Sequence, residues 1–185
     1  MKKYITIYTI LFIILFFTAN SPRAFAQSNF GIGISAGGGT IGGNLPSTGS
    51  FNSSFFIGGN PGFRSNVILR LSFDYAVNID VLLPKSPNRY IPFLKGFSLK
   101  GIISQSLSGQ LYVEEGIGII MLNDRTFSSL NEWDSGLTFS ILPGFDFRNN
   151  EEQGIKIGVG TEYGLTFTNT NVWFLSVHLQ TEYYF

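Results

Sequence analysis

The last ten residues, "SVHLQTEYYF" (residues 176–185), alternate strictly between two kinds of side chain. Odd positions are mostly apolar or aromatic, whereas even positions are mostly polar. Successive side chains of a β-strand point to opposite faces, so this pattern predicts a strand with one apolar face. Chain ends usually fray unless they are paired or docked. We therefore expect this terminal strand to be held by a neighbouring strand.

The same period of two recurs along the chain, most clearly in "NVILRLSFDYAV" (66–77), "GLTFSILPGFDFR" (136–148) and "GIKIGVGTEYGLTF" (154–167). Short links are expected at 60–62, 105–109 and 149–153, and longer ones at 39–50, 78–89 and 123–135. Short and long links alternate along the chain, except that the link at 169–171 is short where a long one is expected. The pattern predicts eight strands in an up-and-down meander, at 29–38, 51–59, 63–77, 90–104, 110–122, 136–148, 154–167 and 172–185.

The first 26 residues have the pattern of a secretory signal peptide. Lys2 and Lys3 precede an uncharged apolar run at 5–17, and the small-x-small motif Ala24-Phe25-Ala26 follows. The run is shorter than the ~20 residues that a spanning helix needs, although an uncleaved anchor is the alternative. We expect residues 1–26 to be removed and residues 27–185 to form a single domain.

Composition narrows the class of that domain. Removal of the leader takes away three of the twelve basic residues and none of the twelve acidic ones, which leaves a net charge of −3 and no basic patch for nucleic acid. Cysteine is absent, so disulfides and thiol chemistry are excluded. The polar faces of the strands are rich in glycine, which suits the narrow interior of a barrel better than a water-facing surface. The sequence predicts an all-β fold, an eight-stranded antiparallel transmembrane β-barrel; the alternative is a soluble lipocalin-like barrel or a β-sandwich.

With its leader, its strands, "YVEEGIGIIML" (112–122) and "TEYYF" (181–185), the chain resembles the small OmpA/OmpX-like outer-membrane barrels of the porin family. The resemblance implies a cell outer-membrane location, periplasmic chaperones and the barrel-assembly machinery as partners in biogenesis, contact with outer-membrane lipids, and a monomer. It also implies that the last strand closes the barrel on the first, because an open edge in lipid leaves backbone groups unsatisfied. In that family the assembly machinery reads a terminal aromatic residue preceded by alternate apolar ones; the matching positions here are Val177, Leu179, Thr181, Tyr183 and Phe185.

The predicted inward face carries a nearly balanced set of charges. Centring the turns predicts that Lys100 lies opposite Glu114, Asp146 opposite Lys156, and Glu162 opposite His178. A small barrel is just wide enough for its own side chains, so these charges predict a lumen filled by salt bridges. The full predicted set is Arg70, Asp74, Lys100, Glu114, Asp146, Arg148, Lys156, Glu162, His178 and Glu182.

These features favour a non-enzymatic barrel with a structural or surface-interaction role in the cell envelope. The alternatives are a narrow porin-type diffusion channel and an accessory barrel of a secretion or motility apparatus. Ser176, His178 and Glu162 share the inward face, but the chain lacks the lipid-facing His-x-Ser pair of the lipid A-modifying barrels. No cofactor or metal is expected, because no ligand cluster, phosphate loop or calcium loop is present.

Two other features are left open by the sequence. Glu115 either faces lipid near the periplasmic edge or sits in a β-bulge beside Glu114. The long links hold Lys85, Arg89, Tyr90, Arg125, Phe127, Trp133 and Asp134. Their aromatic side chains suit an interfacial girdle, and their basic side chains could serve adhesion or contact with lipopolysaccharide phosphates.

Overall fold

The computed structural model describes residues 30–43, 46–62, 66–82, 90–148 and 153–185. The predicted signal peptide therefore lies outside the described residues. Within them, no helix has the length and apolar character that crossing a membrane would require. The elements are β1 (Phe30–Gly42), β2 (Thr48–Gly59), β3 (Val67–Asn78), the short 3-10 helix η2 (Ile79–Leu82), β4 (Phe93–Ser108), β5 (Leu111–Arg125), β6 (Glu132–Asp146), β7 (Gly154–Thr166) and β8 (Trp173–Tyr184).

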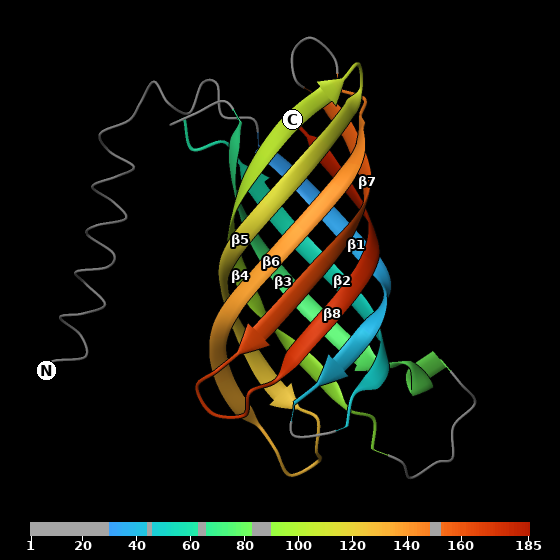
Figure 1. Ribbon diagram of the computed structural model, residues 1–185, viewed down its shortest axis with the longest axis vertical. Helices are drawn as coiled ribbons and strands as arrows, with labels where there is room; N and C mark the ends of the chain where they lie inside the picture. The colour runs from blue at the N-terminus through green and yellow to red at the C-terminus, as the bar shows by residue number, and fades with distance from the viewer. Residues whose placement is uncertain (1–29, 44–45, 63–65, 83–89, 149–152) are drawn as a thin grey trace, which may run out of the picture.

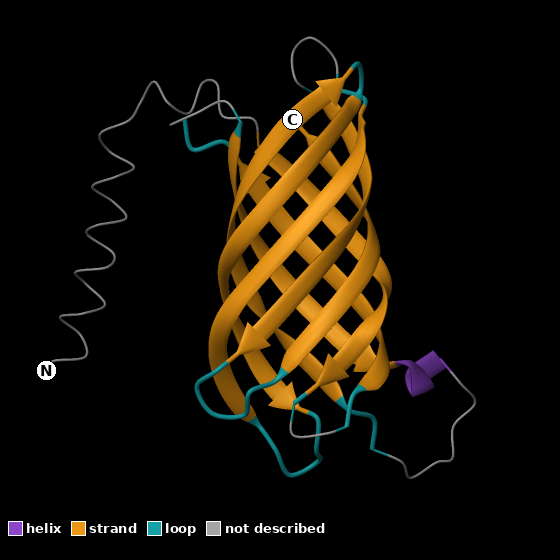
Figure 2. Cartoon of the chain, in the orientation of Figure 1, coloured by secondary structure: helices purple, strands orange, loops and turns teal. Residues whose placement is uncertain are grey.

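The eight strands form one closed antiparallel barrel in which each strand pairs with the next along the chain (Figures 1 and 2). Closure is made by β1 and β8, whose register runs from Gly31 opposite Tyr184 to Gly42 opposite Trp173. Beyond the last strand, the Phe185 amide donates to the Phe30 carbonyl at 3.0 Å. The fold class and the pairing of the last strand with the first are confirmed.

The two ends of the barrel differ in their connections. We call the end at which β1 begins and β8 ends the terminal end, and the opposite end the loop end (top and bottom of Figure 1). The terminal end has a tight turn between β4 and β5, at Gly109 and Gln110, with Gly109 at φ 58°. The loop end carries the long connection at 79–92, which begins with η2.

The strands are longer at the loop end than the sequence predicted. Much of 39–50 and 123–135 was expected to be loop, yet β1 continues to Gly42, β5 continues to Arg125 and β6 begins at Glu132. The alternation of short and long links was therefore wrong in detail. Glycines and polar residues weakened the apolar pattern there, but backbone pairing between neighbouring strands does not depend on it: Thr40 pairs with Gly49 and Asp124 with Glu132.

Side chains follow the predicted alternation between the two faces of the wall. Along β7, Lys156, Gly158, Gly160 and Glu162 are buried in the lumen, whereas Val159 points outward and is 56% exposed. Glycines make room inside: a Cβ on Gly118 would lie 2.7 Å from Cγ of Lys100. Small inward residues thus leave space for long charged side chains from neighbouring strands.

Candidate functional site

The interior of the barrel is the candidate site, because it concentrates the charged residues. All ten predicted lumen residues lie on the inward side. Eight are buried, while Asp146 and Arg148, at the terminal end, are half-buried. They form two ion-pair groups, one near the terminal end and one near the middle of the barrel.

Arg70 and Lys156 organise the group near the terminal end. The Arg70 guanidinium donates from Nη2 to Glu182 at 2.6 Å and to Glu114 at 3.0 Å. The Lys156 ammonium donates to the other oxygen of Glu114 at 3.1 Å and lies 4.0 Å from Asp146. Glu114 is thus held by two cations, and each cation faces two carboxylates.

Aromatic rings fill the space around these cations. Nζ of Lys156 lies 4.4 Å from the centroid of the Tyr112 ring and 5.5 Å from that of Tyr184. Arg148 lies 4.7 Å above Tyr184, and Arg70 lies 4.3 Å above the Phe56 ring. Cations are attracted to the faces of such rings, and this attraction grows when water is excluded. Charge and aromatic bulk together close the terminal end of the lumen.

The second group centres on Glu162. Lys100 donates to both of its carboxylate oxygens, at 2.9 and 2.8 Å, and the Thr138 hydroxyl donates to one of them at 2.8 Å. Asp74, on β3, instead accepts from the Ser98 hydroxyl at 2.8 Å. Lys100 is therefore paired across the lumen with a strand that is not its neighbour.

Two of the three predicted cross-strand pairs were wrong. Lys100 lies opposite Gly118, and Glu114 opposite Ser104, because the β4–β5 turn sits at Gly109 and Gln110 rather than earlier in the link. His178 lies opposite Gly160 rather than Glu162. The partner of Lys100 is thus shifted by four residues and that of His178 by two. An even shift keeps every side chain on its face, so the inward set is unchanged. The third predicted pair, Asp146 opposite Lys156, is present.

The loop end of the lumen is closed by apolar side chains that the sequence analysis missed. They come from five strands and from the residue that precedes β8. Ile120 and Leu122 share the inward face of β5 with Glu114. Extending the two-residue period from Glu114 along the strand would therefore have predicted that both point inward. The cluster consists of Ile41, Ala76, Leu94, Ile120, Leu122, Val172 and Phe174.

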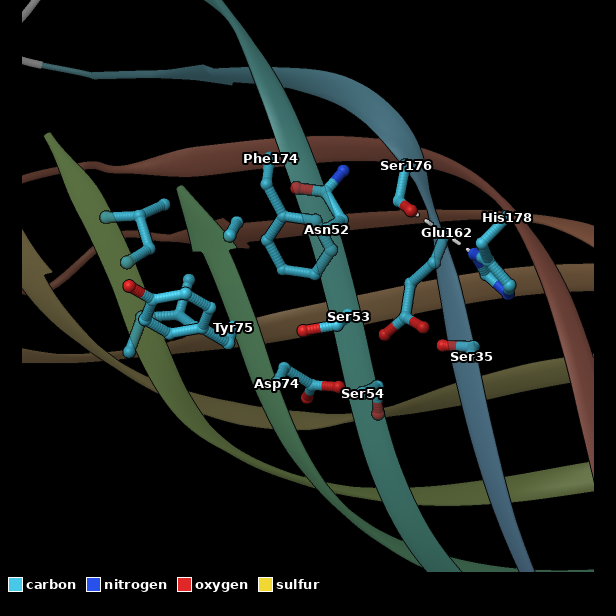
Figure 3. Close-up of a pocket in the computed structure, with 13 residues that line it drawn as sticks. Ser35, Asn52, Ser53, Ser54, Asp74, Tyr75, Glu162, Phe174, Ser176 and His178 are labelled. Carbon is cyan, nitrogen blue, oxygen red and sulfur yellow. Dashed lines mark hydrogen bonds between the residues drawn. The ribbon is translucent and has the colours of Figure 1, made fainter. Parts of the chain in front are cut away.

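A small chamber lined by both polar and apolar side chains lies between the two closures (Figure 3). The carboxylates of Asp74 and Glu162 face it, as do Ser176 and His178, whose Oγ and Nδ1 are 3.2 Å apart. The chamber has a volume of about 20 Å³, and a second, next to Arg70 and Gln180, about 10 Å³. One buried water needs roughly 10–15 Å³ by this kind of measure, so these spaces suit single waters.

Ser176, His178 and Glu162 do not form a hydrogen-bonded catalytic triad. The structure shows the Ser176–His178 contact, but both Glu162 oxygens are taken up by Lys100 and one also by Thr138. A nucleophile of this type needs a base that is oriented by the acid. Among the described residues, no group of three or more His, Asp or Glu side chains is arranged to hold a metal ion.

The predicted loop residues are divided between the rim and the outer surface. Asp134 points inward and binds the end of β7 and the connection that follows it. It accepts hydrogen bonds from the amides of Asn169 (2.5 Å) and Thr170 (2.6 Å) and from the hydroxyls of Thr166, Thr168 and Thr170. Trp133 and Phe127 are exposed. Lys85 and Arg89 lie outside the described residues.

Two remaining predictions concern outward-facing residues. Glu115 is exposed, and the register around it is continuous with Ile103 and Ile141 on either side, so the bulge alternative was wrong. The five residues of the assembly-signal pattern lie on the outer face of β8 and its end: Val177, Leu179, Tyr183 and Phe185 are exposed and Thr181 is half-buried.

Comparison with solved structures places this architecture among known barrels. Neisserial surface protein A (NspA) superposes with a TM-score of 0.65 at 13% sequence identity, covering 85% of this chain and 99% of that one. Ail, the attachment invasion locus protein of Yersinia pestis, in complex with the heparin analogue sucrose octasulfate, gives a TM-score of 0.50 at 13% identity, covering 85% and 97%.

The fold is that of a small eight-stranded outer-membrane barrel. At such low identity the likeness concerns the fold alone. No family model and no curated protein sequence matches this chain.

Proposed function

We propose that this protein is an integral outer-membrane barrel with a structural or surface-interaction role, whose lumen is closed and does not conduct ions. Residues 1–26 would direct export and be removed. The barrel-assembly machinery would then read Phe185 and the alternate apolar residues before it. The observation that carries the proposal is the double closure of the lumen, by ion pairs and aromatics at one end and by apolar side chains at the other.

The outer surface supports insertion in a membrane. Large apolar side chains on this face are exposed in every strand, as Ile34, Phe55 and Leu179 illustrate. A soluble barrel would not present a continuous apolar belt to water. Aromatic side chains mark both ends of the belt, with Trp133 and Trp173 at the loop end and Phe30 and Phe185 at the terminal end. Such girdles occur at the two interfaces of outer-membrane barrels.

The interior supports a closed lumen. A hydrated ion would have to displace buried ion pairs at the terminal end and enter an apolar constriction at the loop end. Breaking a buried pair is costly because it leaves an uncompensated charge, and an apolar constriction tends to exclude water. The two lumen cavities lined by described residues, of about 20 and 10 Å³, each have room for about one or two waters.

Planar-bilayer recording of the refolded protein tests the proposal. We expect the wild-type barrel to show no steady conductance. Two neutral truncations open one end each: Leu122→Ala with Phe174→Ala, and Tyr112→Ala with Tyr184→Ala. Each pair alone should stay closed, because the other closure remains, whereas all four together should conduct.

A folded barrel must be shown for each variant, by its heat-dependent mobility in gel electrophoresis. Steady wild-type conductance that disappears when a Phe replaces Gly164 in the lumen would support a diffusion channel and contradict the proposal. Recovery of the native protein in the soluble periplasmic fraction, without a mobility shift, would contradict membrane insertion itself.

A further inference from the structure

The cations of this barrel are divided between the lumen and one spot on the outer surface. The described residues include six Lys and Arg side chains. Arg70, Lys100, Arg148 and Lys156 all form ion pairs in or at the lumen. Lys95 and Arg125 face outward, and neither forms an ion pair with a carboxylate of the residues that the structure describes. These two are the ones available to an external anion within the described part of the chain.

Lys95 and Arg125 are close neighbours on the outer face. Lys95, on β4, lies opposite Asn123 of β5, and Arg125 follows two residues later, opposite Phe93. Diagonal neighbours of this kind are about 7–8 Å apart across an antiparallel pair. Two long side chains at that spacing can converge on one anionic group.

The surroundings hold Arg125 in place but leave its charge unmatched. Its guanidinium lies 6.0 Å from the Phe93 ring, and its backbone carbonyl accepts a hydrogen bond from the Tyr90 hydroxyl at 2.6 Å. Its Nε is buried and has no hydrogen-bond partner. The adjacent Asp124 points inward, where one of its oxygens accepts two hydrogen bonds from Thr126. An anion from outside the chain would balance the charge of the half-buried Arg125 side chain, whereas the buried Nε itself is out of its reach.

The position of the pair indicates what kind of anion could reach it. Lys95 and Arg125 lie near the loop end, above the apolar outward residues Phe97 and Met121 of the same strands. Tyr75 and Phe93 pack beside them, with tilted rings whose centroids are 5.8 Å apart, as expected at a membrane interface. A lipid whose acyl chains lie against Phe97 and Met121 would bring its head group to the two cations.

We propose that Lys95 and Arg125 form a site for the phosphate of a lipid head group in the leaflet that faces the loop end. The inference rests on the membrane insertion given under the proposed function. Phosphate matches the site because Arg and Lys both donate charge-assisted hydrogen bonds to its oxygens. The tyrosine and phenylalanine rings would pack against the glycerol or sugar part of the head group.

Binding to matched lipids tests the site. The refolded full-length protein, in phosphatidylcholine nanodiscs, is titrated with bisphosphorylated lipid A and with the same lipid after enzymatic dephosphorylation. A basic residue near an anionic lipid surface contributes ~1 kcal/mol, which corresponds to about fivefold in affinity. Lys95→Gln with Arg125→Gln should therefore weaken binding of the phosphorylated form by roughly 25-fold.

Three controls make the result specific. Arg148→Gln removes one cation at the opposite end and should leave lipid affinity unchanged. Lys95→Arg keeps the charge and should bind as the wild type does. Inorganic phosphate, added as competitor at millimolar concentration, should not displace the lipid, because it lacks the contacts with the apolar belt.

The outcomes separate this site from the proposed function. Equal binding of the phosphorylated and dephosphorylated lipids, or wild-type affinity in the Lys95/Arg125 double variant, would overturn the site. Displacement of the lipid by inorganic phosphate would overturn the lipid as its ligand. Failure of the wild-type protein to enter nanodiscs and to show a heat-dependent mobility shift would instead contradict the membrane barrel.

Discussion

The two halves of the lumen are closed by different physical means. Near the terminal end, Arg70, Glu114, Lys156 and Glu182 form a buried ionic network beneath aromatic rings. Near the loop end, the apolar cluster around Leu122 fills the lumen with uncharged side chains. One barrel therefore contains both an electrostatic closure and a hydrophobic closure, in strands that run through both.

The difference shows how each closure constrains the sequence. A buried ionic network tolerates little change, because removing one partner leaves another charge unpaired in a low dielectric. An apolar closure depends on volume, so its members can be exchanged for others of similar size at small cost. We expect loss of charge to be the more damaging change at the terminal end and loss of volume at the loop end.

Arg70→Ala should have the largest effect on stability. The substitution removes the cation shared by Glu114 and Glu182, and Glu182 forms no other ion pair with a cation among the described residues. Breaking a buried pair by removing one partner costs about 3–5 kcal/mol. Urea unfolding of the protein refolded in lipid vesicles, followed by tryptophan fluorescence, measures the change.

Arg148→Ala is the matched control for this prediction. Arg148 also pairs with a carboxylate, Asp146, but both side chains are about one-fifth exposed, so water can compensate and the loss should be under about 1 kcal/mol. Equal free energies of unfolding for Arg70→Ala and Arg148→Ala would show that the buried network is not what stabilises the terminal end.

The two closures also differ in how far the sequence predicted them. The inward position of Arg70, Lys156 and Glu182 follows from the period of two, since a strand has only two faces. Which residue pairs with which depends on turn geometry. Lys100 was matched to the wrong carboxylate because the extent of β4 and the position of Gly109 could not be read from composition.

The apolar closure was not predicted because its pattern is ambiguous. In "GIGIIML" (116–122), Ile119 and Met121 face outward while Ile120 and Leu122 face inward, so the two faces look alike. Contacts across the lumen, such as those of Leu122 with residues of other strands, depend on the stagger of the whole barrel, which no single strand encodes. The sequence therefore predicts the strands of the barrel more readily than the contacts among the side chains that fill its lumen.

Leu122→Ala should destabilise the barrel less than Arg70→Ala. Leu122 is 1% exposed, and its truncation leaves a cavity that costs about 2–4 kcal/mol. Because no charge is involved, raising the salt concentration should not change the difference from the wild type. The same unfolding assay at two ionic strengths checks both statements, and Leu122→Met, which conserves volume, should cost under about 1.5 kcal/mol. If the free energy lost in Leu122→Ala changed strongly with salt concentration, the two closures would be coupled, which contradicts their independence.

Glu115 lies outside both closures. Its substitution should have the smallest effect on the stability of the barrel, and it should stabilise rather than destabilise. Glu115 points outward between Ile103 and Ile141, and Leu111 and Val113 separate it from the terminal end of β5. A lipid-facing carboxylate opposes insertion by less than a basic residue does, so Glu115→Leu should stabilise the barrel by up to about 1 kcal/mol. Glu115→Gln, which removes the charge and keeps the shape, should recover part of that gain in the same unfolding assay. Destabilisation by both variants would mean that the Glu115 carboxylate has a polar partner on the outer surface. The lipid-facing side of the barrel would then contain a polar contact in addition to its apolar belt.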